Sequence, residues 1–345
     1  MRFRELRSLT LIASLAVAAL TFTGCTAESS ANSTDSSGSA QQAAVSYNTP
    51  RTMPEGKGSG EADGVFPRTV VHFAGQTELK TEPKKVVVIS TGQADAVMTL
   101  GIVPTASTAA EGAGAIPQYL VDAFPDDASE LKNITDVGSR VNPDIETIAN
   151  IKPDLIMMNE AGKDPQALYK SLSAVAPTVV TQGTGRYWKQ DFLLLADALG
   201  KTEQAQTWLD EYHADAQSFG ASVQGEPTIS FLRKSEDRTR VYGVASFTGS
   251  VAEDAGLKRP ETQQFTDDTS VDISSEQLDQ ADGDWIFYSV QGGNEAELTD
   301  LALWPTLSAV ADKQTVSVDD DAFYLNVGPT AARSVLNQLK TTLSK

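Results

Sequence analysis

Short apolar runs of strand length, each followed by a helical pattern, constrain the fold of this chain more than any other feature. A continuous apolar run is typical of a strand that is buried on both faces of a parallel sheet. Strands that alternate with helices predict an α/β fold in which helices cover central, mainly parallel sheets. The runs form two series, which predicts two lobes. They lie at residues 85–89, 153–158 and 177–180 in the first series, and at 228–232, 285–290 and 315–318 in the second.

A long helical pattern separates the two series. Apolar residues recur at helical spacing from Ala205 to Phe219, and Gly200 is placed to end the helix before it. Thr202 offers an N-cap. At 1.5 Å per residue such a helix is about 30 Å long, enough to cross a small lobe. We therefore predict an N-terminal lobe over residues 65–201, one long interlobe helix over 202–224 and a C-terminal lobe over 225–345.

The N-terminus has the pattern of an exported lipoprotein. A basic start is followed by the apolar run Leu9–Phe22, which is too short for a stable membrane anchor and suits a signal peptide over residues 1–24. Thr23-Gly24-Cys25 resembles a bacterial lipobox, which predicts a lipid on Cys25, the only cysteine. The alternative is an ordinary signal peptide with an incidental cysteine. Residues 25–64 are rich in Ser, Gly, Ala and Gln, which predicts a disordered tether.

Charge and composition restrict the partners. The chain carries a net charge of −19, and loss of residues 1–24, which hold three Arg and one Glu, leaves −21. So acidic a protein is unsuited to nucleic acid or to electrostatic adhesion to anionic lipid. Beyond the signal peptide, no apolar stretch reaches the length of a membrane span. We expect an extracytoplasmic monomer that is held to the cell membrane through Cys25.

Two glutamates occupy matched positions in the two halves. In the first half, Asn142 is placed as an N-cap with Glu146 in the first turn of the helix that follows. In the second half, Ser274 and Glu276 repeat this arrangement. Acidic side chains in a first turn also simply complement a helix dipole, so this alternative stays open.

The ordered set of these pieces resembles the ferric-siderophore and cobalamin group of substrate-binding proteins that serve ABC importers. The resemblance is carried by segments such as EPKKVVVISTGQADAVMTLGIVP, DVGSRVNPDIETIANIKPDLIM, DISSEQLDQADGDWIF and LWPTLSAVADKQTVSVDDDAFYLNVGPTAARSVL. It implies two lobes joined by one rigid helix, a ligand in the cleft between them and little domain closure. It also implies that Glu146 and Glu276 bind arginines on the two permease subunits.

Composition favours a ligand that brings its metal already chelated. The mature chain holds only His72 and His213, whereas a bare transition-metal site commonly uses several His together with Asp or Glu. A metal whose coordination sphere is filled by a chelator needs cationic donors for the chelator's oxygens and aromatic faces for its carbon skeleton. We therefore expect no cofactor and no direct metal ligand, and a ferric siderophore as the ligand.

Candidate ligand-binding residues occur in both halves. Arg140, before the Asn142 helix, matches an arginine that contacts iron-bound oxygens in similar siderophore binders, and Arg233 ends the strand at 228–232. Similar proteins often carry a binding Trp where this chain has Gln263, Gln264 and Phe265, which leaves the chelator class open. The aromatic candidates are Tyr187, Trp188, Tyr242, Tyr288 and Tyr324.

Other functions remain as alternatives. Cobalamin or haem would suit the same fold, and a tyrosine is available as an axial haem ligand. An exported α/β enzyme is disfavoured because the chain lacks the Gly-x-Ser-x-Gly, post-strand Gly-x-Gly-x-x-Gly and His-Glu-x-x-His motifs. A lipid-anchored adhesin or sensor would not require a deep cleft.

Overall fold

The computed structural model describes residues 47–90, 92–109, 114–236 and 238–344. Residues 1–46 lie outside this part of the chain, and with them the predicted signal peptide, Cys25 and most of the predicted tether. The described residues belong to one compact unit.

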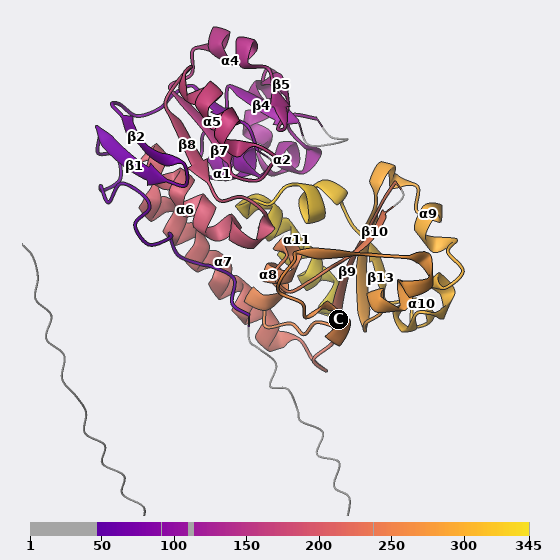
Figure 1. Ribbon diagram of the computed structural model, residues 1–345. Coiled ribbons are helices and arrows are strands. Elements are labelled where there is room, and N and C mark those ends of the chain that lie inside the picture. Colours follow the sequence, from indigo (N-terminus) through magenta and orange to yellow (C-terminus); the bar gives the residue numbers. More distant parts are fainter. Residues whose placement is uncertain (1–46, 91, 110–113, 237, 345) are drawn as a thin grey trace, which may run out of the picture. The chain divides into compact units, whose positions relative to one another are not determined.

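The N-terminal lobe is built on a six-stranded sheet with the strand order β6-β5-β4-β3-β7-β8. All neighbouring strands run parallel except β5 and β6. Strand β3 is buried along its whole length, as its continuous apolar sequence predicts, and so is β8, which has a threonine at each end. Helices cover this sheet (Figure 1), and a hairpin of β1 and β2 precedes it. The elements are β1 Arg68–His72, β2 Gly75–Leu79, β3 Val86–Val88, α1 Gln93–Thr99, β4 Ala106–Ala109, α2 Gln118–Ala123, α3 Ala128–Leu131, β5 Thr135–Ser139, β6 Asn142–Pro143, α4 Ile145–Ile151, β7 Leu155–Asn159, α5 Pro165–Ser173, β8 Thr178–Thr181 and α6 Trp188–Leu199.

The C-terminal lobe has a five-stranded sheet with the order β11-β10-β9-β12-β13. Strands β9, β12 and β13 are parallel, whereas β10 is antiparallel to both of its neighbours, so this sheet is mixed rather than mainly parallel. The α/β fold class predicted from the sequence is confirmed. The elements are β9 Ile229–Ser235, β10 Arg238–Tyr242, α8 Phe247–Asp254, β11 Ser270–Ile273, the 3-10 helix η4 Ser275–Ala281, β12 Trp285–Val290, α9 Ala296–Thr299, α10 Ser308–Ala311, β13 Thr315–Ser317, the π-helix η7 Asp321–Leu325 and α11 Pro329–Leu343.

The helix α7, Thr202–Ser222, connects the two lobes (Figure 1). Gly200 adopts the left-handed conformation that ends α6, as its sequence position predicts. The predicted cap at Thr202 is wrong, because Thr202 is already the first residue of α7. The carboxylate of Asp63 instead accepts bonds from the backbone N–H groups of Thr202 and Glu203, at 2.6 and 3.0 Å. An acidic side chain that is distant in the sequence therefore caps this helix in place of a local residue.

The last helix, α11, ties the C-terminal end of the chain to the N-terminal lobe. Asp95 of α1 is 1% exposed, and its carboxylate accepts bonds from the backbone N–H groups of Thr330 and Ala331, at 2.7 and 2.8 Å. A Cβ added at Gly328 would come within 2.4 Å of the Asp95 carboxyl carbon. The tight junction between α1 and α11 therefore requires glycine at this position.

A buried ion pair forms a second connection between the lobes. Lys189 of α6 and Asp254 of α8 are 2.7 Å apart, and neither side chain is exposed. Nearby, the indole N–H of Trp188 donates to Ser250 Oγ at 2.9 Å. Since burying charges is costly unless they are paired, removal of either ionic partner would destabilise this junction.

The segment 47–64, which we call the strap, contacts both lobes. Thr49 and Arg51 bind Glu253 of α8, and Arg51 also pairs with Asp254 at 2.9 Å. Farther along, Ser59 binds Asp197 of α6 through its backbone N–H and its hydroxyl, at 2.8 and 2.7 Å. The compact unit therefore begins before Val65, where the sequence predicts that the N-terminal lobe starts. Hydrogen bonds rather than apolar burial hold the strap in place. Its sequence of low hydrophobicity therefore did not predict that it belongs to the fold.

In the part of the chain that the structure describes, no helix combines the length and the apolar character needed to cross a bilayer.

The Asp63 cap can be tested by substitution in a chain that begins at Ser46. Asp63→Ala should lower the free energy of unfolding by about 1 kcal/mol, because two N–H groups of α7 lose their acceptor. Glu61→Ala is the matched control, since it removes the same charge from an exposed side chain two residues away. Urea unfolding followed by circular dichroism measures both. Equal midpoints for the two variants would show that Asp63 does not stabilise α7.

Candidate functional site

One face of the C-terminal sheet carries a row of polar side chains. Arg233 on β9 pairs in register with Arg240 on β10 and with Ser289 on β12. Because residues that pair directly across strands project to the same side of a sheet, these three side chains share one face. The register also places Asp272 of β11 opposite Arg240, and the Arg240 Nε donates to its carboxylate at 2.9 Å. The sheet thus brings two arginines together in one row.

Arg233 is held by an acid from another part of the lobe. Its Nε and Nη2 both donate to the carboxylate of Asp320, each at 2.7 Å, in a bidentate geometry. Ser289 Oγ donates to the same carboxylate at 2.5 Å. Burial alone would lower the pKa of Arg233, but the bonds and charge of Asp320 outweigh it and raise the pKa, so the guanidinium stays charged.

Two tyrosines lie beside this ion pair. The rings of Tyr242 and Tyr324 have centroids 4.8 Å apart, and the Tyr324 hydroxyl donates to the carbonyl of Phe287 at 2.8 Å. Burial raises the pKa of both phenols, well above the ordinary value for Tyr324, so both stay neutral at physiological pH. Arg233, Tyr242 and Tyr324, all predicted from the sequence as ligand-binding residues, are therefore brought together in one cluster.

The N-terminal lobe presents a hollow of about 320 Å³ at the ends of β5 and β7. Arg140 lies in the turn between β5 and β6, is exposed, and donates to the carbonyl of Ala161 at 3.3 Å. Lys163 adds a second exposed cation, and Val141 is 71% exposed. Sequence reasoning missed Lys163, although the loop directly after a buried strand was a signal for it. Among the described residues, no hydrogen bond or ion pair joins Arg140 to the Arg233 cluster.

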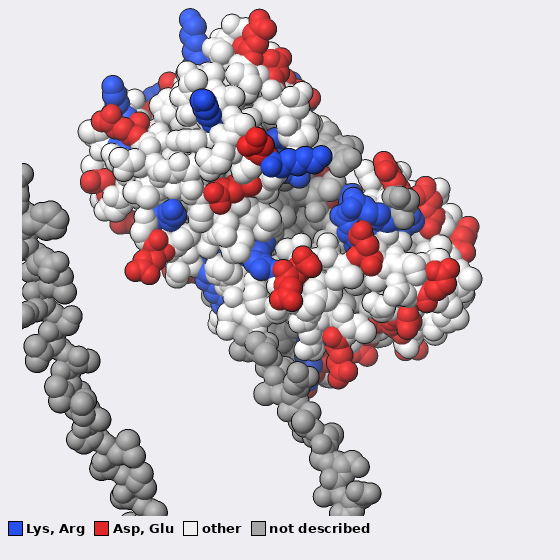
Figure 2. All heavy atoms as spheres, in the orientation of Figure 1, with Lys and Arg blue, Asp and Glu red and all other residues white. Residues whose placement is uncertain are grey.

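Figure 2 shows a hollow between the two lobes, with Lys and Arg side chains on both sides of it. The rest of the visible face carries many acidic side chains (Figure 2). Acidic side chains also lie beside the hollow (Figure 2), and the Lys and Arg side chains there favour ligands that present oxygen acceptors.

The remaining aromatic candidates lie elsewhere. Trp188 is 2% exposed at the lobe junction, where its ring packs edge-on against Tyr212 and Phe247. Tyr187 precedes it and is half-buried. Tyr288 lies one residue out of phase with Ser289, so it faces the opposite side of the sheet, where it packs on Trp304 and donates to Glu295 at 3.0 Å. The structure therefore does not bring Tyr288 together with Arg233.

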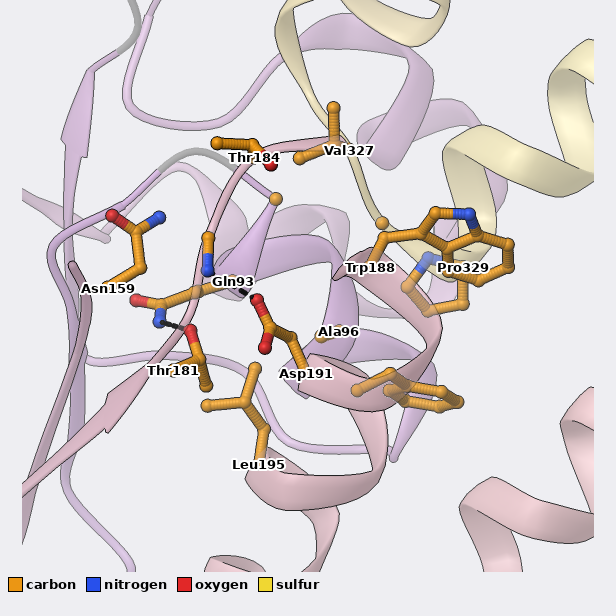
Figure 3. A pocket seen from close by; sticks show the side chains of 14 residues that line it. Gln93, Ala96, Asn159, Thr181, Thr184, Trp188, Asp191, Leu195, Val327 and Pro329 are labelled. Carbon is orange, nitrogen blue, oxygen red and sulfur yellow. Dashed lines mark hydrogen bonds between the residues drawn. The ribbon is translucent and has the colours of Figure 1, made fainter. Parts of the chain in front are cut away.

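A small cavity lies where α6, β8 and the start of α11 meet (Figure 3). Its volume of about 20 Å³ accommodates about one water molecule and no chelate. Asp191 lines it and accepts bonds from the backbone N–H groups of Gly183 and Gln182, at 2.7 and 3.1 Å. Burial nevertheless raises the pKa of Asp191 to about 7.

The two glutamates occupy equivalent positions. Glu146 is the second residue of α4 and Glu276 the second residue of η4, and both are exposed. The predicted cap at Asn142 is wrong, because Asn142 pairs within the sheet as part of β6 and Asp144 caps α4 by accepting from the Thr147 N–H at 3.0 Å. The predicted cap at Ser274 is confirmed as part of a capping box.

Comparison with known proteins identifies a matching family. Residues 86–322, which include Arg140, Arg233 and Asp320, match the model of a family described as periplasmic binding protein. The probable siderophore-binding lipoprotein YfiY of Bacillus subtilis is 28% identical over 312 residues, which cover 84% of this chain and 92% of that protein. The Fe(3+) dicitrate-binding periplasmic protein FecB of Escherichia coli is 23% identical over 277 residues, covering 78% and 88%.

A solved structure supports the same arrangement. Staphylococcus aureus SirA complexed with staphyloferrin B superposes with a TM-score of 0.69 at 26% identity, covering 80% of this chain and 98% of that one. The agreement spans both lobes, since 80% of this chain is more than either lobe alone contains.

The raised pKa of Asp191 predicts a pH dependence of stability. The native carboxyl holds its proton to a higher pH than the unfolded one, so the native state binds more protons between the ordinary value of 3.8 and about 7. The stability that this proton binding contributes is fully present below that window and is lost as the pH rises through it. Asp191→Asn cannot titrate, so its free energy of unfolding should fall less steeply across the window. Urea unfolding at several pH values measures the slope, and equal slopes in wild type and variant would contradict the assignment.

Proposed function

Because the chain belongs to the periplasmic binding protein family, we propose that it captures a ferric siderophore between its two lobes and delivers it to an ABC importer. The similarity to a probable siderophore-binding lipoprotein and to SirA supports the ligand class. The observation that carries the proposal is the cluster of Arg233, Tyr242 and Tyr324 in one lobe, with exposed Arg140 and Lys163 in the other.

The donors suit a chelated metal better than a bare ion. Guanidinium and ammonium groups donate to the oxygens of a chelator, and aromatic rings pack on its carbon skeleton. Among the described residues, no group of three or more His, Cys, Asp or Glu side chains is arranged to hold a metal ion. A ferric siderophore brings iron with its coordination sphere already filled, which suits donors of this kind.

Haem or cobalamin is the second candidate within the same fold. A tyrosine can ligate haem iron, but the Tyr324 hydroxyl already donates to the Phe287 carbonyl, which disfavours it in that role. Tyr242 is also neutral and is half-buried. An exported α/β enzyme is the more distant alternative.

The proposal also includes the membrane and the permease. A lipid on Cys25 would anchor a monomer on the extracytoplasmic side of the cell membrane, which agrees with the lipoprotein names of similar proteins. Glu146 and Glu276 would bind the two permease subunits, one from each lobe. This docking role is supported by the equivalent, exposed position that each glutamate holds at the start of a helix.

Ligand capture can be tested with a chain that begins at Ser46, titrated with ferric hydroxamates, ferric catecholates, ferric citrate, haem and cobalamin. At least one ferric siderophore should quench Trp fluorescence saturably. Arg140→Ala and Arg233→Ala should each weaken its binding by about ten- to a hundredfold, because each removes a charge-assisted hydrogen bond.

Lys258→Ala is the control for those variants, since it removes an exposed cation that pairs with Glu226. Circular dichroism checks that each variant keeps its fold. Unchanged affinity in both arginine variants would refute the ligand assignment of these residues, and saturable binding of haem or cobalamin alone would favour the second candidate.

Docking can be tested by charge reversal in living cells. Single exposed ion pairs contribute only about 0–1 kcal/mol, so both contacts should be reversed together. The double variant Glu146→Arg with Glu276→Arg should abolish uptake of labelled ferric siderophore while the purified protein still binds it. Glu203→Arg with Glu211→Arg, on the exposed side of α7, matches the change in charge and should leave uptake intact. Equal uptake by both double variants, at matched protein levels, would rule out docking through Glu146 and Glu276.

A further inference from the structure

Asp320 accepts two hydrogen bonds from Arg233, which could otherwise donate them to a ligand oxygen. Its carboxylate takes both the Nε and the Nη2 donors of Arg233, at 2.7 Å each, in the same geometry that a chelator's carboxylate would use. The Arg233 side chain is 7% exposed and that of Asp320 is 21% exposed. The acid is thus the more accessible partner, and a ligand that approaches the arginine meets it.

The backbone around Asp320 holds this carboxylate in place. Asp320 lies between β13 and the π-helix η7, a rare type of turn that often occurs at functional sites. The neighbouring Asp319 accepts from the Ala322 N–H at 2.7 Å, and Tyr324 of η7 is bonded to β12 through the Phe287 carbonyl. Ser289 adds a third donor to Asp320. The acid therefore belongs to a fixed part of the lobe.

The charge balance differs between the two lobes. Both arginines of the sheet row have a carboxylate partner, Asp320 for Arg233 and Asp272 for Arg240. On the other lobe, the exposed cations Arg140 and Lys163 line the hollow of about 320 Å³ together with one acid, Asp164, which caps α5 by accepting from the Ala167 N–H. The C-terminal row therefore offers hydrogen-bond donors without a net positive charge.

We propose that Asp320 sets the charge preference of the ligand site, disfavouring strongly anionic ferric chelates relative to neutral or cationic ones. This inference rests on the proposed function and deepens it. A carboxylate next to the ligand repels a polyanion and attracts a cation, and the low dielectric of a partly buried site strengthens both effects. The same carboxylate leaves Arg233 able to donate from the nitrogen that Asp320 does not bind.

The test compares wild type and Asp320→Asn, which keeps the size of the side chain and removes its charge. Three ferric chelates of different net charge serve as probes: anionic ferric enterobactin, neutral ferrichrome and cationic ferrioxamine B. The ratio of the Kd for the anionic probe to the Kd for the cationic probe should fall by about tenfold in Asp320→Asn at low ionic strength. If wild type binds only the anionic probe, its affinity should rise in Asp320→Asn. If wild type binds only the cationic probe, its affinity should fall. High salt should reduce the shift, because mobile ions screen a partly exposed charge.

Ser289→Ala is the matched control, since it removes one hydrogen bond to Asp320 and no charge. It should leave the ratio of the two Kd values unchanged. Asp320→Ser, which also lacks the charge, should shift the ratio in the same direction as Asp320→Asn and guards against a folding defect in one variant.

The outcomes separate this inference from the proposed function. Equal weakening for all three probes would mean that Asp320 only orients Arg233, and an unchanged ratio would mean that its charge does not reach the ligand. Either result overturns the charge preference while siderophore binding stands. If wild type binds no probe and no other ferric siderophore, the proposed function falls and this inference falls with it.

Discussion

The carboxylate of Asp95 holds the first backbone N–H groups of α11, and the relation between the two lobes depends on this contact. Thr330 and Ala331 donate to it from α11, and the Tyr119 hydroxyl donates to it from α2 at 2.8 Å. Burial raises the pKa of Asp95, while these donors oppose that shift. A helix N-terminus favours a negative partner, so an acid in one lobe fixes the end of a helix that follows the other lobe's last strand. The cluster around Arg233 and the hollow around Arg140 belong to the two lobes that this contact joins.

Three further connections support the same junction. The interlobe helix α7 joins the lobes covalently, the buried pair of Lys189 and Asp254 joins α6 to α8, and the strap hydrogen-bonds to helices of both lobes. On α7, Asp215 also binds Arg333 and Lys340 of α11, at 2.9 and 2.5 Å. Because these contacts come from separate segments, opening the lobes would break several of them at once. We therefore expect the lobes to keep this arrangement when a ligand binds, rather than to close around it.

Much of this architecture could be predicted from local sequence patterns. The buried strands, the interlobe helix and the α/β class follow from apolar runs and helical spacing, which are properties of neighbouring residues. Arg233 was predicted because strand ends mark sites in α/β folds, and Tyr242 because it follows Arg233 closely in the sequence. Arg240 was missed although it stands two residues before Tyr242 on the same strand, a spacing that places both on one face.

Long-range contacts explain what the sequence could not reveal. Asp320 is 87 residues from Arg233, and Asp63 is 139 residues from the helix end it caps. The strap has the composition of a tether, and only its partners in α6 and α8 make it part of the fold. Tyr288 was misplaced for a simpler reason, because a shift of one residue along a strand reverses the face to which a side chain points.

The central claim, that the lobes form one rigid unit with a preformed site, is tested most directly by the distance between them. A chain from Ser46 lacks the only cysteine, so Ser171→Cys and Asp300→Cys place one spin label on an exposed position of each lobe. Pulsed electron paramagnetic resonance would then give the distance distribution with and without a bound siderophore loaded with diamagnetic gallium in place of iron. The account predicts a shift of less than about 2 Å between the two states. A larger shift, or a broad distribution that narrows only on binding, would contradict it.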